Sequence, residues 1–247
     1  MLHRILIVTA VAAEADSVSA GLGFDGPQPL PLPGGRTLRR HVRGAVRVDV
    51  LVGGVGPAAV AAATGAALAH TAPGTPEDGY DLVVSAGIAG GFQPTAPIGS
   101  VVVSSAIVAA DLGAETPDGY LAVEELGFGR SVHPVPTALT DRIAAALDTG
   151  ARPHVVAPVL TVSTVTGTAR RAAELAERRP GAAAEAMEGF GVAEAAAAHG
   201  VPVVELRTVS NAVGPRDRAA WRIGEALDAL RHTFALLGRT VFVEAHP

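Results

Sequence analysis

Residues 82–92 have the sequence LVVSAGIAGGF, an apolar run that gives way to small residues and glycines. Such a run is typical of a buried strand of a parallel sheet, and the glycines after it predict a tight turn that lets a ligand approach the backbone closely. The turn lacks the lysine of a phosphate-binding loop and the glycine spacing of a dinucleotide-binding loop. We therefore expect Ala89 and Gly90 to contact a different kind of ligand, with Phe92 either in the core or stacked on a flat base.

Comparable β-branched runs recur along the chain and alternate with Ala-rich stretches of helical spacing. Strands are predicted over residues 4–9, 46–52, 82–85, 100–108, 154–162 and 203–209. Helices are predicted over residues 57–70, 136–147, 168–179, 188–199 and 219–242, and Gly- and Pro-rich surface loops over 23–35 and 73–78. Because near-continuously apolar strands need cover on both faces, the pattern predicts a three-layer α/β/α fold with a mixed central sheet.

The overall composition limits the classes of protein and ligand. A chain of 247 residues suits one domain spanning 1–247, and 49% apolar against 17% charged residues predicts a large core rather than disorder. The 19 basic residues are scattered and outnumbered by 24 acidic ones, which argues against nucleic acid as a partner and favours a small-molecule ligand. The absence of cysteine excludes disulfides, zinc–thiolate sites and a cysteine nucleophile, and it fits a cytoplasmic protein.

Neither a leader nor a membrane span is expected. The first apolar run, residues 1–9, is too short for a secretory signal. Residues 50–76 contain no Asp, Glu, Lys or Arg, but the sequence GGVGP at 53–57 breaks this stretch into a strand, a turn and a buried helix. The histidines and acids show no metal-ligand spacing, so no metal and no cofactor are expected.

Glu14 is the first candidate for a catalytic residue. It follows the first predicted strand and stands near the start of a helix, at the carboxyl strand edge where ligands collect in α/β sheets. An alternative role is that Glu14 and Asp16 only complement the helix dipole. The position alone leaves both roles open.

Met187 and Glu188 form the second candidate site, between an apolar strand and an Ala-rich helix. One carboxylate can accept hydrogen bonds from two adjacent hydroxyls, which suits a sugar diol. A first-turn helix acid with no ligand is the alternative.

The third candidate site is the polar segment RTVSNAVGPRDR at residues 207–218. Ser210 and Asn211 follow a buried strand, and an Asn side chain both donates and accepts, as the edge of a base requires. Alternatively, Asn211 caps a turn and residues 216–218 form a solvated charge cluster. We expect Trp221 to belong to the core rather than to a pocket wall.

These segments, in this order, resemble the nucleoside phosphorylase and nucleosidase superfamily, in the branch that contains the 5′-methylthioadenosine/S-adenosylhomocysteine nucleosidases and the futalosine hydrolases. The resemblance spans nearly the whole chain and implies a hydrolase of purine nucleosides that forms a homodimer or a higher homo-oligomer. It implies that Glu14 is the water-activating base and that Met187 and Glu188 bind the ribose.

Asn211 falls where the adenine-specific nucleosidases of this branch carry an Asp. An Asn cannot act as an acid, but its amide can donate to O6 of a 6-oxopurine while its carbonyl accepts from N7–H, which implies hypoxanthine as the base. Together, Asn211, the sequence GPRDR at residues 214–218 and Trp221 resemble the futalosine hydrolases, which release hypoxanthine from futalosine on a route to menaquinone. Glu185 stands one place earlier than the acid that precedes the Met in relatives, so it receives no role.

Two parts of such a site are less defined. Futalosine carries a carboxyphenyl arm on its 5′ side, and Phe92 with Arg216 or Arg218 are the candidates to receive it. Asp217 is a possible proton donor to the leaving base, but an ion pair with Arg216 or Arg218 is the simpler expectation for it.

Three other functions compete with this one. An adenine nucleosidase acting on methylthioadenosine, S-adenosylhomocysteine or aminofutalosine is the nearest. A phosphorylase is less favoured, because it needs arginine contacts to phosphate near the first strand and residues 9–16 contain no Arg. A non-catalytic nucleoside-binding module on the same fold is the third.

Overall fold

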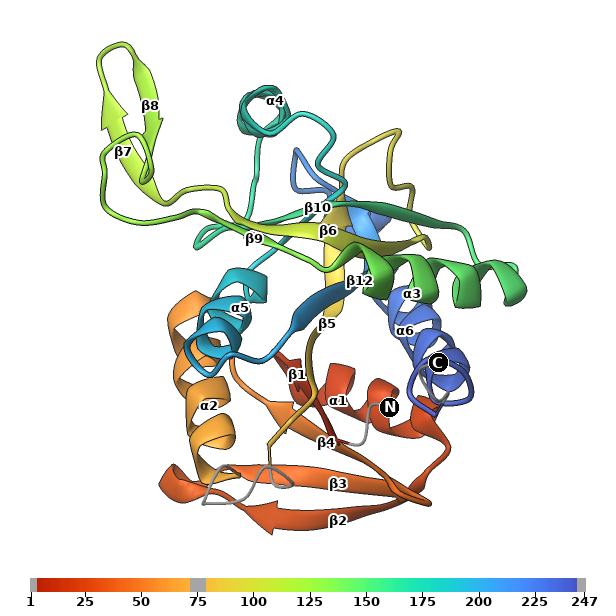
Figure 1. Ribbon diagram of the computed structural model, residues 1–247. Coiled ribbons are helices and arrows are strands. Elements are labelled where there is room, and N and C mark those ends of the chain that lie inside the picture. Colours follow the sequence, from red (N-terminus) through yellow and green to blue (C-terminus); the bar gives the residue numbers. More distant parts are fainter. Residues whose placement is uncertain (1–3, 72–78, 244–247) are drawn as a thin grey trace.

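The structure, a computed structural model, describes residues 4–71 and 79–243, and it has three layers (Figure 1). A ten-stranded sheet lies in the centre, with helices α2 and α5 against one face and α1, α3 and α6 against the other. Parallel and antiparallel pairings both occur in this sheet. The predicted three-layer α/β fold with a mixed sheet is therefore confirmed.

The main path of the sheet has the order β11-β10-β6-β12-β5-β1-β4-β3-β2, with β9 paired to β6, and β7 pairs with β8 in a separate hairpin. The strands are β1 (Arg4–Thr9), β2 (Asp25–Pro31), β3 (Thr37–Arg43), β4 (Val46–Val52), β5 (Leu82–Gly91), β6 (Val101–Ala109), β7 (Gly113–Thr116), β8 (Gly119–Ala122), β9 (Val132–Pro134), β10 (His154–Thr161), β11 (Ala184–Ala186) and β12 (Val203–Ala212). The α-helices are α1 (Ala12–Leu22), α2 (Pro57–His70), α3 (Thr137–Thr149), α4 (Ala169–Arg178), α5 (Gly189–Ala198) and α6 (Ile223–Leu237), with short 3₁₀ turns at Pro33–Gly35 and Arg218–Ala220. No helix in the described ranges is both long and apolar enough to cross a membrane.

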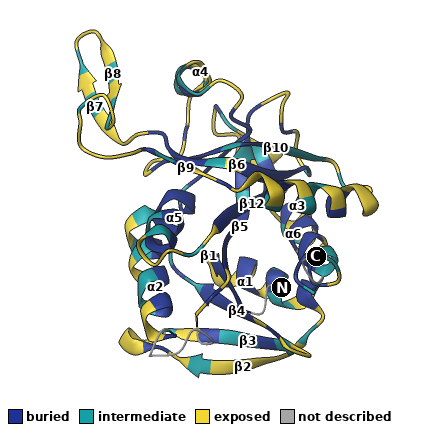
Figure 2. Ribbon diagram, in the orientation of Figure 1, coloured by how far each residue is buried: buried dark blue, intermediate teal, exposed yellow. Residues whose placement is uncertain are grey.

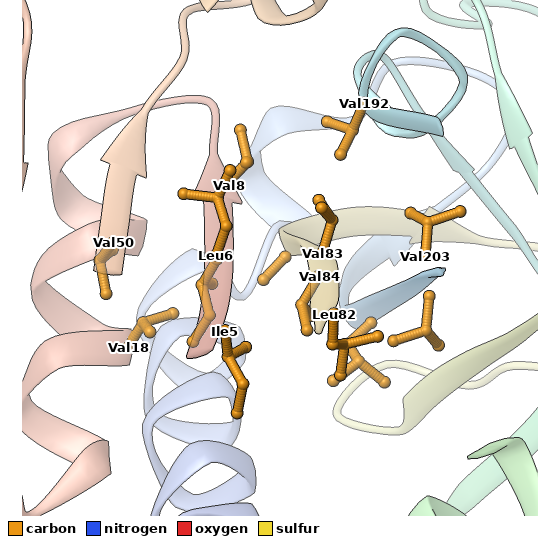
Figure 3. Packing of buried hydrophobic residues seen from close by; sticks show 14 of the residues in the cluster. Ile5, Leu6, Val8, Val18, Val50, Leu82, Val83, Val84, Val192 and Val203 are labelled. Atoms are coloured by element: carbon orange, nitrogen blue, oxygen red, sulfur yellow. The ribbon is translucent and has the colours of Figure 1, made fainter. Parts of the chain in front are cut away.

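The central strands are buried because helices cover both of their faces (Figure 2). All six residues of β1 are buried, which explains why its sequence shows no polar alternation. Figure 3 shows Leu6 and Val84 of adjacent strands packed in one cluster with Val18 of α1 and Val192 of α5. This core fixes the carboxyl ends of the strands, from which the site residues come.

Three predicted boundaries are wrong. Residues 23–35 are not an unstructured loop, because β2 pairs antiparallel with β3 as an exposed edge strand, a place where prolines are tolerated. The expected glycine turn after residue 85 is strand, since β12 and β11 pair with β5 as far as Gly91. The last helix spans only Ile223–Leu237 rather than 219–242. The predicted loop at 73–78 lies outside the described residues.

The parallel pairing of β4, β1, β5 and β12 brings four carboxyl strand ends to one edge of the sheet. The first turn of α1, the loop at 53–56, the end of β5 and the end of β12 therefore meet there. Open α/β sheets bind their ligands at this edge.

Candidate active site

One cavity of about 280 Å³ opens at this edge of the sheet. Candidate residues from three separate segments converge on it, with Glu14, Glu188 and Asn211 all in its wall. The lining comprises Ala10, Val11, Glu14, Ile88, Ala89, Gly90, Val165, Thr166, Glu185, Ala186, Met187, Glu188, Ser210, Asn211, Val213 and Trp221.

Glu14 is held by three backbone N–H groups. Its Oε2 accepts from Ala10 (3.0 Å) and Val11 (3.3 Å), and its Oε1 accepts from Ile88 (2.9 Å). Because Glu14 is the third residue of α1, the contact with Val11 satisfies a free amide at the helix start. The carboxylate is thus fixed by its own helix and by β5 at once.

Burial raises the pKa of Glu14 above its ordinary value, an effect that the positive charge of Arg207 partly opposes. The charge of Glu188 adds to the upward shift. A carboxylate with a raised pKa is a stronger base and accepts a proton from water more readily.

Gly87 makes room for this arrangement. A Cβ atom at this position would collide with Oε1 of Glu14 and would stand 2.6 Å from Nη1 of Arg207. The glycine at this point of β5 therefore serves close side-chain approach rather than the turn that the sequence suggested.

Glu188 lies beside Glu14 in the cavity wall and is the N-cap residue of α5. Its Oε1 accepts from the backbone of Gly56 (3.3 Å), and its Oε2 accepts from Nη2 of Arg207 (3.1 Å) and from the backbone of Met187 (3.3 Å). The carboxylate is thus fixed in place while it still faces the cavity.

Arg207 contacts the carboxylates of the site, a position that the sequence pattern did not indicate. It is 1% exposed, and it binds Oε1 of Glu205 through Nε (2.8 Å) and the carbonyl oxygen of Ile88 through Nη1 (3.3 Å). Burial opposes its charge, but Glu205, Glu188 and Glu14 together raise its pKa above the ordinary value. The guanidinium of Arg207 therefore hydrogen-bonds Glu205 and Glu188, and its charge also stabilises the Glu14 carboxylate.

Glu205 belongs to the same buried cluster but not to the cavity wall. Burial raises its pKa, and the charge of Arg207 opposes that shift. Its Oε2 has no hydrogen-bond partner among the described residues. The sequence does carry a signal for this pair, because two charged residues at positions i and i+2 of an otherwise apolar strand share one buried face.

Asn211 lies at the end of β12. Its Oδ1 accepts from the hydroxyl of Ser210 (2.8 Å), and its Nδ2 donates to the carbonyl oxygen of Ala212 (3.0 Å). One N–H and one lone pair of the amide remain, which is the donor and acceptor pair that a base edge needs. Ser210 thereby orients the amide.

Glu185, to which no role was given, also lines the cavity. The backbone N–H of Thr166 donates to its Oε1 (2.8 Å), and the Thr166 hydroxyl donates to its Oε2. Burial raises the pKa of Glu185, and these two hydrogen bonds oppose the shift.

The expectation for Trp221 is wrong, and of the two places open to Phe92 the structure shows the core. Trp221 lines the cavity instead of joining the core, with the guanidinium carbons of Arg216 and Arg218 at 5.3 and 5.7 Å from its ring centre. Phe92 is outside the cavity lining and packs in a buried cluster with Val108 and Leu160.

The expected ion pair of Asp217 is not formed with Arg216 or Arg218 in the described structure. Its carboxylate instead accepts from the backbone of Ala219 (3.2 Å) at the start of a 3₁₀ turn, while both arginines lie against Trp221. Asp217 therefore caps that turn, a structural role that its place in the charged run did not indicate.

The cavity therefore brings together two buried carboxylates and an amide. A base at Glu14 can deprotonate water, Glu188 can accept from hydroxyls, and Asn211 can pair with the edge of a heterocycle. Among the residues that the structure describes, no three His, Cys, Asp or Glu side chains form a metal-binding group.

Comparison with known proteins shows the family to which this fold belongs. Residues 4–242 match the sequence profile of the phosphorylase superfamily. A 5′-methylthioadenosine/S-adenosylhomocysteine nucleosidase of Helicobacter pylori, solved as a point mutant with 5′-methylthioadenosine in the active site, has the same fold with a TM-score of 0.80 at 20% identity, over 98% of this chain and 99% of that one. The chain belongs to the phosphorylase superfamily.

Two curated relatives narrow the family further. The futalosine hydrolase of Streptomyces coelicolor is 62% identical over 228 residues, which cover 92% of each chain. The futalosine hydrolase of Acidothermus cellulolyticus is 48% identical over 233 residues, 94% of this chain and 89% of that one. Within the superfamily, the chain belongs to the futalosine hydrolase family.

Proposed function

We propose that this protein hydrolyses the N-glycosidic bond of futalosine and releases hypoxanthine and dehypoxanthine futalosine, a step on a route to menaquinone. The observation that carries the proposal is that Glu14 and Asn211, from opposite ends of the chain, line one cavity of about 280 Å³. The names of the relatives at 62% and 48% identity support the same substrate.

Glu14 is the base in this proposal. Cleavage of the glycosidic bond develops positive charge on the sugar, and a carboxylate both stabilises that charge and deprotonates the attacking water. The three N–H donors to Glu14 hold its oxygens in place, and burial raises its pKa towards the working pH. The water, held by Glu14, attacks the face of the sugar opposite the purine.

Glu188 and Asn211 act on the two parts of the nucleoside. Glu188, fixed by Arg207, accepts hydrogen bonds from the ribose hydroxyls, with Met187 against the sugar. A solvent water protonates N7 of hypoxanthine as the glycosidic bond breaks, while Glu14 keeps the proton of the attacking water. Asn211 donates to O6 of the departing hypoxanthine and accepts from N7–H, with Ser210 as its orienting partner. Ala89 and Gly90 line the floor on which the base rests.

The 5′ arm needs an apolar surface and a cation. Trp221 supplies the apolar surface at the cavity wall, and Arg216 or Arg218, which lie against its ring, supplies the cation. Phe92 lies outside the cavity and packs in a buried cluster. We assign the carboxyphenyl arm to this part of the wall.

A chromatographic screen of futalosine, aminofutalosine, inosine and methylthioadenosine tests the proposal by the base released. Hypoxanthine from futalosine, at a rate far above that of adenine from aminofutalosine or methylthioadenosine, is the expected result. Release of adenine alone contradicts the assignment of Asn211, and no release from any of the four contradicts catalysis.

We also propose that the protein is cytoplasmic and forms a homo-oligomer. The β7–β8 hairpin projects from the body of the fold (Figure 1). Leu121 in this hairpin and the nearby Leu112 and Phe128 are exposed, with Phe128 at 81%. Exposed apolar side chains on a projecting arm favour contact with a second copy. Light scattering of the purified protein should give at least twice the mass of 24.8 kDa, and a monomer would contradict this part.

A further inference from the structure

Glu185 is a cavity-lining carboxylate that the mechanism above does not use. It is 6% exposed, and the two donors that it receives both come from Thr166. A carboxylate has about four lone-pair positions, so two remain for a ligand. A buried charged group in a ligand cavity needs such a partner, because burial without one is costly.

The strand register places Glu185 opposite Asn211. Gly90 of β5 pairs with Glu185 of β11 on one side and with Asn211 of β12 on the other. Paired residues of adjacent strands point to the same face, and strands lie about 4.8 Å apart, so the two side chains flank Gly90 with their Cα atoms roughly 10 Å apart.

Gly90 places no side chain of its own between them. A Cβ atom there would stand 3.0 Å from Cγ2 of Val213 and 3.3 Å from Nδ2 of Asn211, so Val213 and the amide both reach towards the glycine. A flat base that lies over Gly90 packs against Val213 and has one polar group at each side.

The chemistry of the two flanking groups matches one edge of a 6-oxopurine. This edge presents N7, O6 and N1–H in sequence, and Asn211 is assigned to the first two. N1 of a 6-oxopurine is a donor, whereas N1 of adenine is an acceptor that a carboxylate repels. A site that leaves a buried polar group unmatched rejects the wrong base strongly.

We propose that Glu185 is a specificity-determining residue whose carboxylate accepts a hydrogen bond from N1–H of the 6-oxopurine, across Gly90 from Asn211. This inference rests on the proposed function for the identity of the base. Thr166 orients the carboxylate, and the base N–H supplies the third donor. Burial raises the pKa of Glu185 despite the two hydrogen bonds from Thr166, and a further donor from the base would stabilise its charged form.

Binding of free bases tests this without turnover. Calorimetry on the full chain compares hypoxanthine with 1-deazahypoxanthine, in which a C–H replaces N1–H at nearly the same size. The wild-type protein should bind hypoxanthine roughly 10- to 100-fold more tightly, as expected for one hydrogen bond to a charged group. Glu185→Met, which is close in size and has no acceptor, should reduce this preference to within about threefold, with Glu185→Gln between the two.

Glu177→Met is the matched control. It makes the same replacement at an exposed position of α4, outside the cavity lining, so the preference for hypoxanthine should stay at the wild-type value. If Glu185→Met and Glu185→Gln weaken the binding of hypoxanthine and of 1-deazahypoxanthine equally, so that the preference for hypoxanthine remains, Glu185 is only structural and the inference is overturned. An equal affinity of the wild-type protein for both bases overturns it as well.

These outcomes are separate from the fate of the proposed function. A wild-type protein that hydrolyses futalosine but shows no preference for N1–H retains the function and loses the inference. A protein that shows the preference and loses it in Glu185→Met, yet leaves futalosine intact, retains the inference and loses the proposed function.

Discussion

The backbone N–H of Ile88 donates a 2.9 Å hydrogen bond to Oε1 of Glu14, across 74 positions of the chain. The carbonyl oxygen of the same residue accepts from Nη1 of Arg207 (3.3 Å). Ile88 therefore positions both Glu14, the proposed catalytic base, and Arg207, the cation that lowers its pKa. The geometry of the site depends on the sheet rather than on a mobile loop.

Glu14→Gln should abolish turnover, because an amide cannot accept the proton of the attacking water. We expect kcat to fall by on the order of 10²–10⁴-fold or more, with binding of futalosine retained, as measured by steady-state kinetics and calorimetry. Glu177→Gln, an exposed position on α4, is the matched control and should stay at wild-type activity. Activity of Glu14→Gln near the wild-type level would exclude Glu14 as the base.

Gly87→Ala should impair catalysis, because the added methyl group collides with Oε1 of Glu14 and crowds Arg207. We expect kcat to fall by at least about tenfold, since a base displaced by about 1 Å loses much of its effect. Gly65→Ala in α2 is the control: no atom lies within 4 Å of its added Cβ, so activity should stay unchanged and stability should rise by about 0.5–1 kcal/mol. Equal activity of the two variants would contradict the proposed crowding.

Glu205→Gln should move the acid limb of the kcat/KM profile to lower pH. Glu14 must be ionised to act, so kcat/KM falls as the pH drops through its raised pKa. In Glu205→Gln, the positive charge of Arg207 is balanced by two carboxylates, Glu188 and Glu14, instead of three. The net positive potential at Glu14 rises, and the pKa of Glu14 falls. A pH–rate series on both proteins measures the shift, and an unchanged limb or a shift to higher pH would refute this coupling.

Asn211→Asp should change the base that the enzyme releases. An aspartate can accept from the exocyclic amine of adenine and can protonate N7, which the amide cannot. We expect a gain of adenine release from aminofutalosine or methylthioadenosine and a loss of hypoxanthine release of at least about tenfold, measured by chromatography of the products. An unaltered base preference would argue that Asn211 does not touch the base.

The sequence was sufficient for the layers and for the main strands. The apolar runs of β1, β4 and β5 are short and rich in β-branched residues, and the Ala-rich α2 has helical spacing, so the sequence distinguishes the two kinds of element. It was not sufficient for β2, whose three prolines indicate a loop unless the strand lies at an edge, or for the end of β5, whose glycines indicate a turn unless neighbouring strands pair with them. In both cases tertiary pairing outweighed the local preference.

Part of the site was equally accessible from the sequence. Glu14 follows β1 and Asn211 stands near the end of β12, and the shared edge of the parallel strands brings these two positions together. Glu188 follows β11, which reaches the same site although it pairs antiparallel with β5. Arg207, Glu185 and Trp221 were missed because their roles depend on which side chains face them across strands, which spacing along the chain does not reveal. The roles of all these residues, and a single domain over 1–247, stay predictions.

Hydrolysis of futalosine in H₂¹⁸O that contains phosphate measures the source of the atom that replaces the base. Mass spectrometry should find free hypoxanthine and a sugar product with one ¹⁸O at the anomeric carbon, at a rate that phosphate does not change. A sugar 1-phosphate, a requirement for phosphate, or intact futalosine would contradict a water activated by Glu14.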